Sequence, residues 1–502
     1  MTTKTISTYV AAGYSLSSAY SRLVIRASGG IGGTGLLADS YARIFNDGVV
    51  HGHRPSNGIV LNAGGFIQNG ATNVTGALIE GPEGVFVTGA AGTVVNYGTI
   101  DGSSVNRARN AGIDLRYGGS VTNGGAGDTT ALIEGPEGIS GGRRATISVA
   151  NYGEIRGGVY GIVLSYGTVT NFSTISGGRT AVFLSSSSDV LVVEAGCEFD
   201  GAIYGGGGTL VLANGTGTLT GLLPGSGVTV SGSMAPTTFG SFATVEVGAG
   251  ATFSSSGAVT IAILGVQTLI DAGSLTLGGA KTTVVNAGVI ETSGAGVLTV
   301  QGAINNTGLL SADGGTLTVN GAVNNTGQLN ADGGTLTVNG AVTGRGRANV
   351  DGGTLDFVSA FNEAVGFTGK TGVLELARSQ TYNATVTGFS RNGGTSLDLA
   401  DIGFVSAGEA TFAGTKTGGI LTVTDGTHTA TIRLAGDYRA STFVAASDGH
   451  GGTIVQASTA PAHRLVAAMA GLGGGGAGAV HAAAEPWRSP PPMLGPPRVA
   501  LA

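Results

Sequence analysis

The chain has 502 residues, of which 95 are glycine and 11% are charged, and its formal net charge is −6. These numbers exclude three classes: the chain is too apolar to be disordered, its glycines lack the period of collagen, and no basic stripe exists to bind nucleic acid. No run of 18 apolar residues occurs, so we expect no membrane-spanning segment. The single cysteine, Cys197, excludes an intramolecular disulfide and is interpreted as a small buried residue.

Residues 1–28 are predicted to be an N-terminal entry or cap segment. They lack the uninterrupted apolar core of a signal peptide, so export would need either another route or a further N-terminal segment. Gly30, Gly32 and Gly35 follow, and they imitate a dinucleotide-binding fingerprint that would require a strand before and a helix after them. Because "RIFNDGVVHG" comes next and alternates like a strand with its turn, we interpret these glycines as turn residues.

Residues 29–200 contain a long repeat in which an asparagine precedes a turn and an Ile or Val. The octapeptide "ALIEGPEG" also recurs, at Ala77–Gly84 and Ala131–Gly138, which is twice the 27-residue spacing from Asn96 to Asn123. The recurring asparagines are Asn46, Asn96, Asn123, Asn151 and Asn171. We predict that they lie above one another at buried turns and bond both to local backbone and to one another.

Residues 201–357 carry shorter repeats, which become strictly periodic at 19 residues toward their end. The positions that follow this period are Leu298, Leu317, Leu336 and Leu355; Val300, Val319 and Val338; Gly302, Gly321 and Gly340; and Asp313, Asp332 and Asp351. Short alternating runs such as "TLTV" between Gly and Asn turns indicate strands. One repeat cannot bury its own apolar face, so successive repeats must stack. The sequence therefore predicts an all-β fold, a parallel β-helix (β-solenoid) of some eighteen turns, roughly 85 Å long at the spacing of strands in a sheet.

Residues 358–457 lose the period but keep strand patterns, and we predict a C-terminal β segment that caps the open end of the stack. Residues 458–502 are rich in Ala, Gly and Pro, and are predicted to be disordered, with a short helix at Ala462–Leu472 as the alternative.

Several motifs invite a chemical interpretation, and each also has a structural one. Ala364–Thr371 nearly matches a phosphate-binding loop, but the residues after it alternate like a strand, so no helix N-terminus is expected there. His51 and His53, like His450, lack visible further metal ligands and are interpreted as surface or turn residues.

Three periodic aspartates, Asp313, Asp332 and Asp351, make up the only regular acidic column that we recognise. They are interpreted as turn residues that bond their own backbone, with a weak column of divalent ions as the alternative. Two stacked threonine columns are also expected, Thr316 with Thr335 and Thr354, and Thr318 with Thr337. They are interpreted as ordinary strand residues, and an ice- or lattice-binding face is the alternative.

The chain resembles bacterial adhesin-like β-solenoid repeat proteins of the autotransporter-passenger and haemagglutinin-like kind. The resemblance rests on the Asn-Tyr-Gly-x-Ile turns, on "GTLVLANGTGTLTGL" (Gly208–Leu222) and on "YRASTFVAASDGHGGTIV" (Tyr438–Val455), and it extends over most of residues 5–457. It implies a right-handed parallel β-helix, export, and a role at the cell surface or in a matrix.

We therefore expect a non-catalytic, secreted or cell-surface rod with a structural or adhesive role, and no catalytic, cofactor-binding or metal site. The expected partners are host or cell-surface glycans or proteins, or further copies of the chain, and no nucleic acid. The alternative is a glycan-binding or polysaccharide-processing β-helix, which would need two or three carboxylates on one face.

Overall fold

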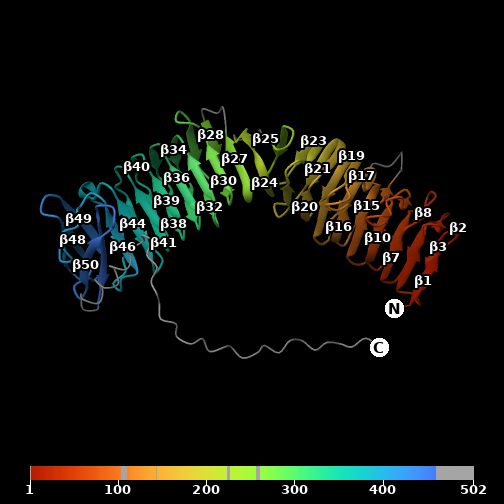
Figure 1. Cartoon of the computed structure of the whole chain (residues 1–502), viewed down its shortest axis with the longest axis horizontal. Coiled ribbons are helices and arrows are strands. Elements are labelled where there is room, and N and C mark those ends of the chain that lie inside the picture. Colours follow the sequence, from red (N-terminus) through yellow and green to blue (C-terminus); the bar gives the residue numbers. More distant parts are fainter. Residues whose placement is uncertain (1, 103–109, 143, 223–226, 256–259, 460–502) are drawn as a thin grey trace, which may run out of the picture.

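The computed structural model describes residues 2–102, 110–142, 144–222, 227–255 and 260–459, and the described chain is a parallel β-solenoid of about 17 turns. Figure 1 shows an elongated, bowed stack that begins with β1 (Thr3–Ile6) at one end and finishes with β50 (Thr442–Ser447) at the other. The one helical element among the described residues is the short 3-10 helix Ser379–Thr381. No helix in these ranges is long and apolar enough to cross a membrane. The predicted tail helix and most of the predicted disordered tail lie outside the described residues.

Each turn contributes strands to parallel columns, and the first column is paired without interruption along the whole stack. It contains β1, β4 (Arg22–Ile25), β7 (Ala42–Asn46), β10 (Gly65–Asn69), β13 (Gly92–Asn96), β16 (Gly119–Asn123), β18 (Ile147–Asn151), β20 (Gly167–Asn171), β22 (Val190–Val193), the first parts of β24 (Thr209–Thr220) and β27 (Thr244–Ser255), β29 (Thr268–Asp271), β32 (Val289–Ser293), β35 (Leu309–Asp313), β38 (Gln328–Asp332), β41 (Arg347–Asp351), β43 (Ala364–Phe367) and β45 (Thr385–Thr387).

The second and third columns of the N-terminal half follow the first column within each turn. The second contains β2 (Tyr9–Val10), β5 (Gly30–Ile31), β8 (Val49–His51), β11 (Leu78–Glu80), β14 (Thr99–Asp101) and the first parts of β17 (Leu132–Gly141), β19 (Glu154–Leu164), β21 (Thr174–Leu184) and β23 (Glu198–Tyr204). The third contains β3 (Tyr14–Leu16), β6 (Leu36–Ala38), β9 (Ile59–Leu61), β12 (Val85–Val87), β15 (Ala111–Leu115), the later parts of β17 to β23, and β26 (Thr237–Gly240).

The C-terminal half has a corresponding pair of columns. One contains the later parts of β24 and β27, β30 (Ser274–Leu277), β33 (Val297–Val300), β36 (Thr316–Val319), β39 (Thr335–Val338), β42 (Thr354–Phe357), β44 (Gly372–Leu376) and β46 (Thr395–Leu399). The other is a separate five-stranded sheet of β28 (Thr260–Ile263), β31 (Thr283–Asn286), β34 (Ala303–Asn306), β37 (Val323–Asn325) and β40 (Val342–Gly344).

The 19-residue period is confirmed as the register of the stack. Leu298, Leu317, Leu336 and Leu355 pair in order and are completely buried. Stacking identical apolar residues fills the interior with a continuous column, which removes each leucine from water without demanding a new packing solution at each turn. The glycines of the period have a steric role as well, because a Cβ on Gly340 would lie 2.2 Å from the carbonyl oxygen of Gly321.

The buried asparagine ladder is confirmed and is longer than expected. The Nδ2 of each asparagine donates to the Oδ1 of the next at 2.8–2.9 Å, and every member is completely buried. The members are Asn46, Asn69, Asn96, Asn123, Asn151 and Asn171. A second ladder, Asn286, Asn306 and Asn325, lies in the C-terminal half and ends on the carboxylate of Glu363. Both ladders provide hydrogen bonds for buried amides that would otherwise be costly to desolvate, although the Oδ1 of Asn286 at the start of the second ladder has no partner among the described residues.

The stack is interrupted in the middle by an inserted hairpin. β25 (Val228–Gly232) pairs antiparallel with β24 and with β26, while β26 pairs in parallel with β23. The strand that would be expected to follow β26 in the third column, β28, belongs to the separate five-stranded sheet. The first column therefore connects the two halves, together with the later parts of β24 and β27.

Antiparallel strands cover the C-terminal end. β47 (Ala410–Gly414), β48 (Gly418–Thr424) and β49 (Thr429–Ala435) form a meander that joins β45, and β50 with β51 (Thr453–Ser458) forms a hairpin that joins β46. We call this unit the cap. A cluster of four aromatic rings, Phe389, Phe412, Tyr438 and Phe443, packs beneath it. The cap strands pair with backbone N–H and C=O groups that would have no partner if the last parallel strands were an open edge.

Parallel pairing extends outside the range 29–357 on both sides. At the N-terminal end, Thr3–Ile6 pairs with Arg22–Ile25 inside the segment for which we expected an entry or cap. At the other end, β42 pairs with β44, and β44 pairs with β46. The segment that was expected to be a C-terminal β unit thus continues the solenoid before the antiparallel cap begins.

Candidate functional site

A column of three carboxylates lies on the outside of the stack just before the cap. Asp356 in β42 pairs with Glu375 in β44, and Glu375 pairs with Asp398 in β46. Each side chain is partly exposed, on turns about 4.8 Å apart. We call these residues the carboxylate column. The prediction that Asp313, Asp332 and Asp351 make up the only regular acidic column is therefore wrong.

The loop between β50 and β51 adds charge beside the carboxylate column. Asp448 accepts hydrogen bonds from the backbone N–H groups of His450 at 2.7 Å and Gly452 at 2.9 Å, which hold its side chain in the turn. The Asp448 carboxylate and the His450 ring are both close enough to change the pKa of Glu375, in opposite directions. Four carboxylates and one imidazole therefore share one electrostatic environment.

Burial is the main reason why the pKa values of these carboxyl groups are raised. Burial and, to a smaller extent, the nearby Glu375 and Asp448 carboxylates together raise the pKa of Asp398 to about 7. The pKa values of Glu375 and Asp356 are also raised, again mainly by burial. The Oδ1 atom of Asp398 is enclosed and has no hydrogen-bond partner among the described residues. Near neutral pH, the column can therefore hold protonated and ionised carboxyl groups side by side.

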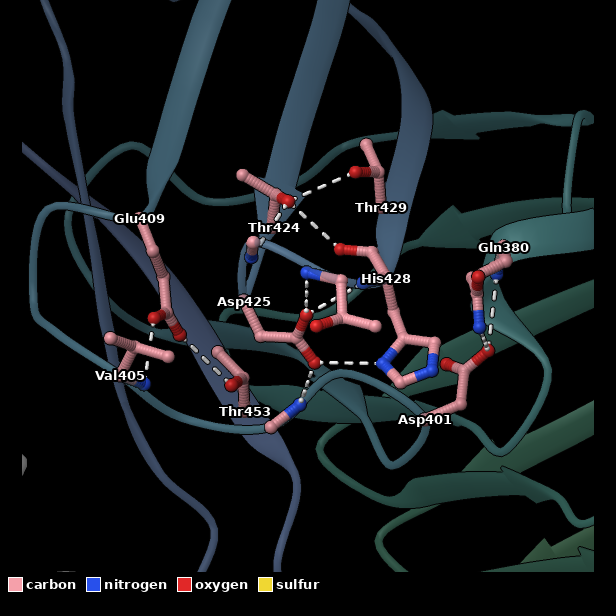
Figure 2. A network of polar contacts seen from close by, with 12 residues as sticks. Gln380, Asp401, Val405, Glu409, Thr424, Asp425, His428, Thr429 and Thr453 are labelled. Atoms are coloured by element: carbon pink, nitrogen blue, oxygen red, sulfur yellow. Dashed lines mark hydrogen bonds and ion pairs between the residues drawn. The ribbon is translucent and has the colours of Figure 1, made fainter.

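A second polar network lies in the cap, as Figure 2 shows. The Asp425 carboxylate accepts from the backbone N–H of His428 at 2.6 Å and contacts its ring Nδ1 at 2.9 Å, and these bonds hold the pKa of Asp425 well below its usual range. Glu409 accepts from two backbone N–H groups and from the Thr453 hydroxyl, and Asp401 accepts from Gln380. Asp425 thus holds the turn between β48 and β49, Glu409 holds the loop that leads into β47, and Asp401 holds the 3-10 helix at Ser379–Thr381.

A charged ladder follows the second column of the N-terminal half. His51, Glu80, Asp101, Glu134 and Arg156 occupy equivalent positions on successive turns. His51 pairs with Glu80 at 2.9 Å and Arg156 with Glu134 at 3.3 Å, while burial and the neighbouring carboxylates raise the pKa of Asp101 to about 6. The Arg156 cation at one end of the acidic run and the hydrogen bond from the His51 ring at the other offset part of the repulsion between like charges in register.

The histidines and the cysteine lie in different surroundings. The His51 and His53 rings meet edge to face at 4.6 Å, and a shallow pocket of about 260 Å³ lies between them and Glu80. Within the described ranges, no group of three or more His, Cys, Asp or Glu side chains is arranged to hold a metal ion. His450 is exposed in the loop before β51, and Cys197 is completely buried, which raises the pKa of its thiol to about 12.

The glycine-rich motifs lie among strands. Gly30 begins β5, and the segment after the Gly30, Gly32 and Gly35 motif forms β6 and β7 in place of the helix that a dinucleotide site needs. Ala364–Thr371 similarly includes β43 and is followed by β44. Neither motif presents the N-terminus of a helix to a phosphate group.

The periodic aspartates and threonines stack as expected. Asp313, Asp332 and Asp351 are exposed at the ends of β35, β38 and β41. Among the described residues no backbone N–H donates to their carboxylates, so the prediction that they bond their own backbone is wrong. The neighbouring carboxylates contribute to raising the pKa of Asp332. The threonine column that contains Thr318 and Thr337 extends over four turns, since Thr276 and Thr299 precede them. Asp356 takes the next position of this column, so the carboxylate column continues it.

The charged positions that sequence reasoning missed had a detectable signal. From Asp356 to Glu375 is 19 residues, which is the period of the preceding repeats. The signal was weakened because Asp alternates with Glu, and because the next interval, to Asp398, is lengthened by the 3-10 helix at Ser379–Thr381.

No family model, no curated protein and no solved structure matches the chain.

Proposed function

We propose that this protein is a non-catalytic rod that works outside the cell, at the surface or in the surrounding matrix, where it binds extended partners along its sides. The observation that supports the proposal is the in-register stacking, which repeats the same outward side chains at about 4.8 Å intervals, as in the four-turn threonine column. A regular array suits a partner that is itself a repeating polymer, because many weak contacts then act together. Cell-surface glycans are the partners that fit this description best.

Two measurements test the proposed role. Antibody labelling of intact cells, with protease treatment as a control, should detect the chain on the outside of the producing organism or in the medium. Purified protein should be retained on immobilised polysaccharide, and fragments of half the length should be retained much more weakly, because avidity depends on the number of contacts. Protein found only inside cells, or no retention on any polysaccharide or cell surface, would contradict the proposal.

A second function, polysaccharide cleavage, is favoured by the carboxylate column alone. A glycosidase needs one protonated and one ionised carboxyl group beside the scissile bond, roughly 5–9.5 Å apart. Asp398, with its pKa raised to about 7, would be the acid, and Glu375 would be the base or nucleophile. Their turns are about 4.8 Å apart, close to the shorter spacing.

Turnover on a panel of polysaccharides separates the two functions. Cleavage should be abolished by Glu375→Gln and by Asp398→Asn, and kept by Asp351→Asn, which alters an exposed carboxylate on the neighbouring column. The rate should fall as the pH rises above about 7, because the acid then loses its proton. If no member of the panel is cleaved, or if both variants cleave normally, this second function is wrong.

A further inference from the structure

A cavity of about 600 Å³ opens on the side of the rod where the stack is interrupted. β23 and β26 line it on one side, and the end of β28 with the start of β29 lines it on the other. Because β26 and β28 belong to different sheets, the described residues form no ladder of hydrogen bonds that would hold these two strands at the usual spacing of about 4.8 Å. The cavity is thus a direct result of the inserted hairpin.

The lining of this cavity combines aromatic rings with neutral polar groups. Phe199, Phe239, Phe242 and Tyr204 contribute rings, and Thr238 and Gln267 are among the polar residues. None of the described lining residues carries a charge. A charged ligand would therefore find no counter-charge there, and burying its charge would be costly.

A row of aromatic side chains on the outer face leads to the cavity. The centroids of the Tyr160 and Phe183 rings are 6.3 Å apart, and those of Phe183 and Tyr204 are 6.2 Å apart. Phe183 is 37% exposed and Tyr204 is 45% exposed, although large apolar side chains are usually buried in soluble proteins. Tyr204 belongs both to the row and to the cavity wall, so the two form one continuous surface.

The position of Phe242 in the cavity depends on a glycine. A Cβ on Gly205 would lie 2.4 Å from the Phe242 ring, so the ring packs directly on the backbone at the end of β23. Only glycine permits this approach. The ring is thereby held beside Tyr204, at the junction of row and cavity.

We propose that the cavity and the aromatic row together bind a neutral oligosaccharide, with one sugar ring in the cavity and the following rings along Tyr204, Phe183 and Tyr160. The C–H faces of a sugar ring pack against the electron-rich faces of aromatic rings, and its hydroxyls suit the threonine and glutamine groups. The volume lies in the usual range of ligand pockets, about 300–1,000 Å³. This inference rests on the proposed glycan-binding function and names one site for it.

The test uses the full-length protein and three uncharged probes: cellohexaose, chitohexaose and maltohexaose. Isothermal titration calorimetry should detect binding of at least one with a Kd below about 1 mM. Tyr204→Ala removes the shared ring at an exposed position, and Ala262→Trp fills the cavity from β28; each should weaken that binding at least tenfold. Tyr41→Ala is the matched control, since Tyr41 is 57% exposed on the loop between β6 and β7, and it should bind like the unaltered protein.

Two results would overturn the inference. If a hexasaccharide binds but neither Tyr204→Ala nor Ala262→Trp weakens it, the site is elsewhere and the general glycan-binding proposal survives. If none of the three binds below 1 mM, the site is not for neutral saccharides. Retention of the rod on polysaccharide or cells then decides the proposed function separately. Circular dichroism spectra that match the unaltered protein ensure that each variant is folded.

Discussion

Single buried amides connect the turns of this rod, and their energetic role can be measured. Asn96 accepts from Asn69 at 2.9 Å and donates to Asn123 at 2.8 Å and to the carbonyl oxygens of Gly98 and Leu132, both at 3.0 Å. Asn96→Ala leaves buried partners without hydrogen bonds, each at a cost of about 1–3 kcal/mol. We expect a loss of roughly 2–4 kcal/mol in urea unfolding followed by circular dichroism.

An exposed asparagine ladder supplies the control for this prediction. Asn339 donates to Asn320 at 2.8 Å, but both side chains are exposed, so water can replace either partner. Asn339→Ala should therefore change the unfolding free energy by less than about 0.5 kcal/mol. Equal losses of unfolding free energy for the two variants would show that burial does not determine how much the ladder hydrogen bonds contribute to stability.

Asp398 gives the carboxylate column a testable dependence on pH. Its folded pKa of about 7 lies above its ordinary value, so the folded protein holds a proton that the unfolded chain releases between about pH 4 and 7. The unfolding free energy should fall as the pH rises through this window. Asp398→Asn should remove this fall and stabilise the protein at pH 8 by about 1 kcal/mol, allowing for solvent screening.

The comparison for this residue is the exposed Asp200, whose change to Asn should leave the pH profile unaltered. Thermal melts at pH 4.5 and pH 8 measure both variants. A profile for Asp398→Asn identical to that of the unaltered protein would show that the proton is held elsewhere.

Sequence reasoning found residues whose surroundings repeat and missed those whose surroundings do not. Asn46 and Asn96 were identified because a turn with a recognisable residue pattern follows each of them. Asn69 was missed because it begins the segment "NGATNVTG", which lacks the turn pattern, although its side chain lies in the same ladder. An asparagine joins the ladder because of its position in the solenoid turn. The sequence reveals that position only where the length of the turn and the residues after the asparagine are the same as in the other repeats.

The cap is the element whose loss should have the most local effect. Phe443 packs against Phe389 and Phe412, with ring centroids 6.3 and 5.5 Å away. Phe443→Ala should cost about 3–5 kcal/mol within the cap. Because stacked turns interact mainly with their neighbours, hydrogen exchange should speed up in β47 to β51 and stay unchanged in β1 to β16.

Exchange measured by mass spectrometry locates this effect along the chain. Val121→Ala, in the buried interior of β16, is the reciprocal variant and should loosen the N-terminal turns and spare the cap. Uniform acceleration in both variants would mean that the stack unfolds as one cooperative unit.

The inserted hairpin could not be predicted from its sequence. The segment that begins "GGGGTLVLANG" has the same glycine-rich turns and alternating runs as the repeats around it, so it was interpreted as the start of shorter turns. Strand direction depends on pairing partners, and alternation is the same in parallel and antiparallel strands. The cavity and the aromatic row at this place were therefore invisible before the structure.

At the scale of the whole molecule, the interruption should divide the rod into two cooperative units. Among the described residues, β26 of the third column does not pair with β28 of the five-stranded sheet. The two halves therefore share fewer backbone hydrogen bonds than successive turns elsewhere in the stack. Urea unfolding should show at least two transitions, with the turns before β23 and those after β28 losing exchange protection at different midpoints. Coincident midpoints in both halves would contradict this division.

The two amide ladders also give the rod a chemical direction. Every asparagine Nδ2 in them donates to the next member toward the C-terminus. All hydrogen bonds of a ladder therefore run in the same direction, and each amide must be followed by an acceptor. Glu363 ends the second ladder, because its carboxylate accepts from Asn325 and from the backbone N–H of Gly346, and burial raises the pKa of this carboxyl group. Glu363 therefore marks the C-terminal end of the second ladder, while parallel strand pairing continues beyond it, from β43 to β45 and from β44 to β46.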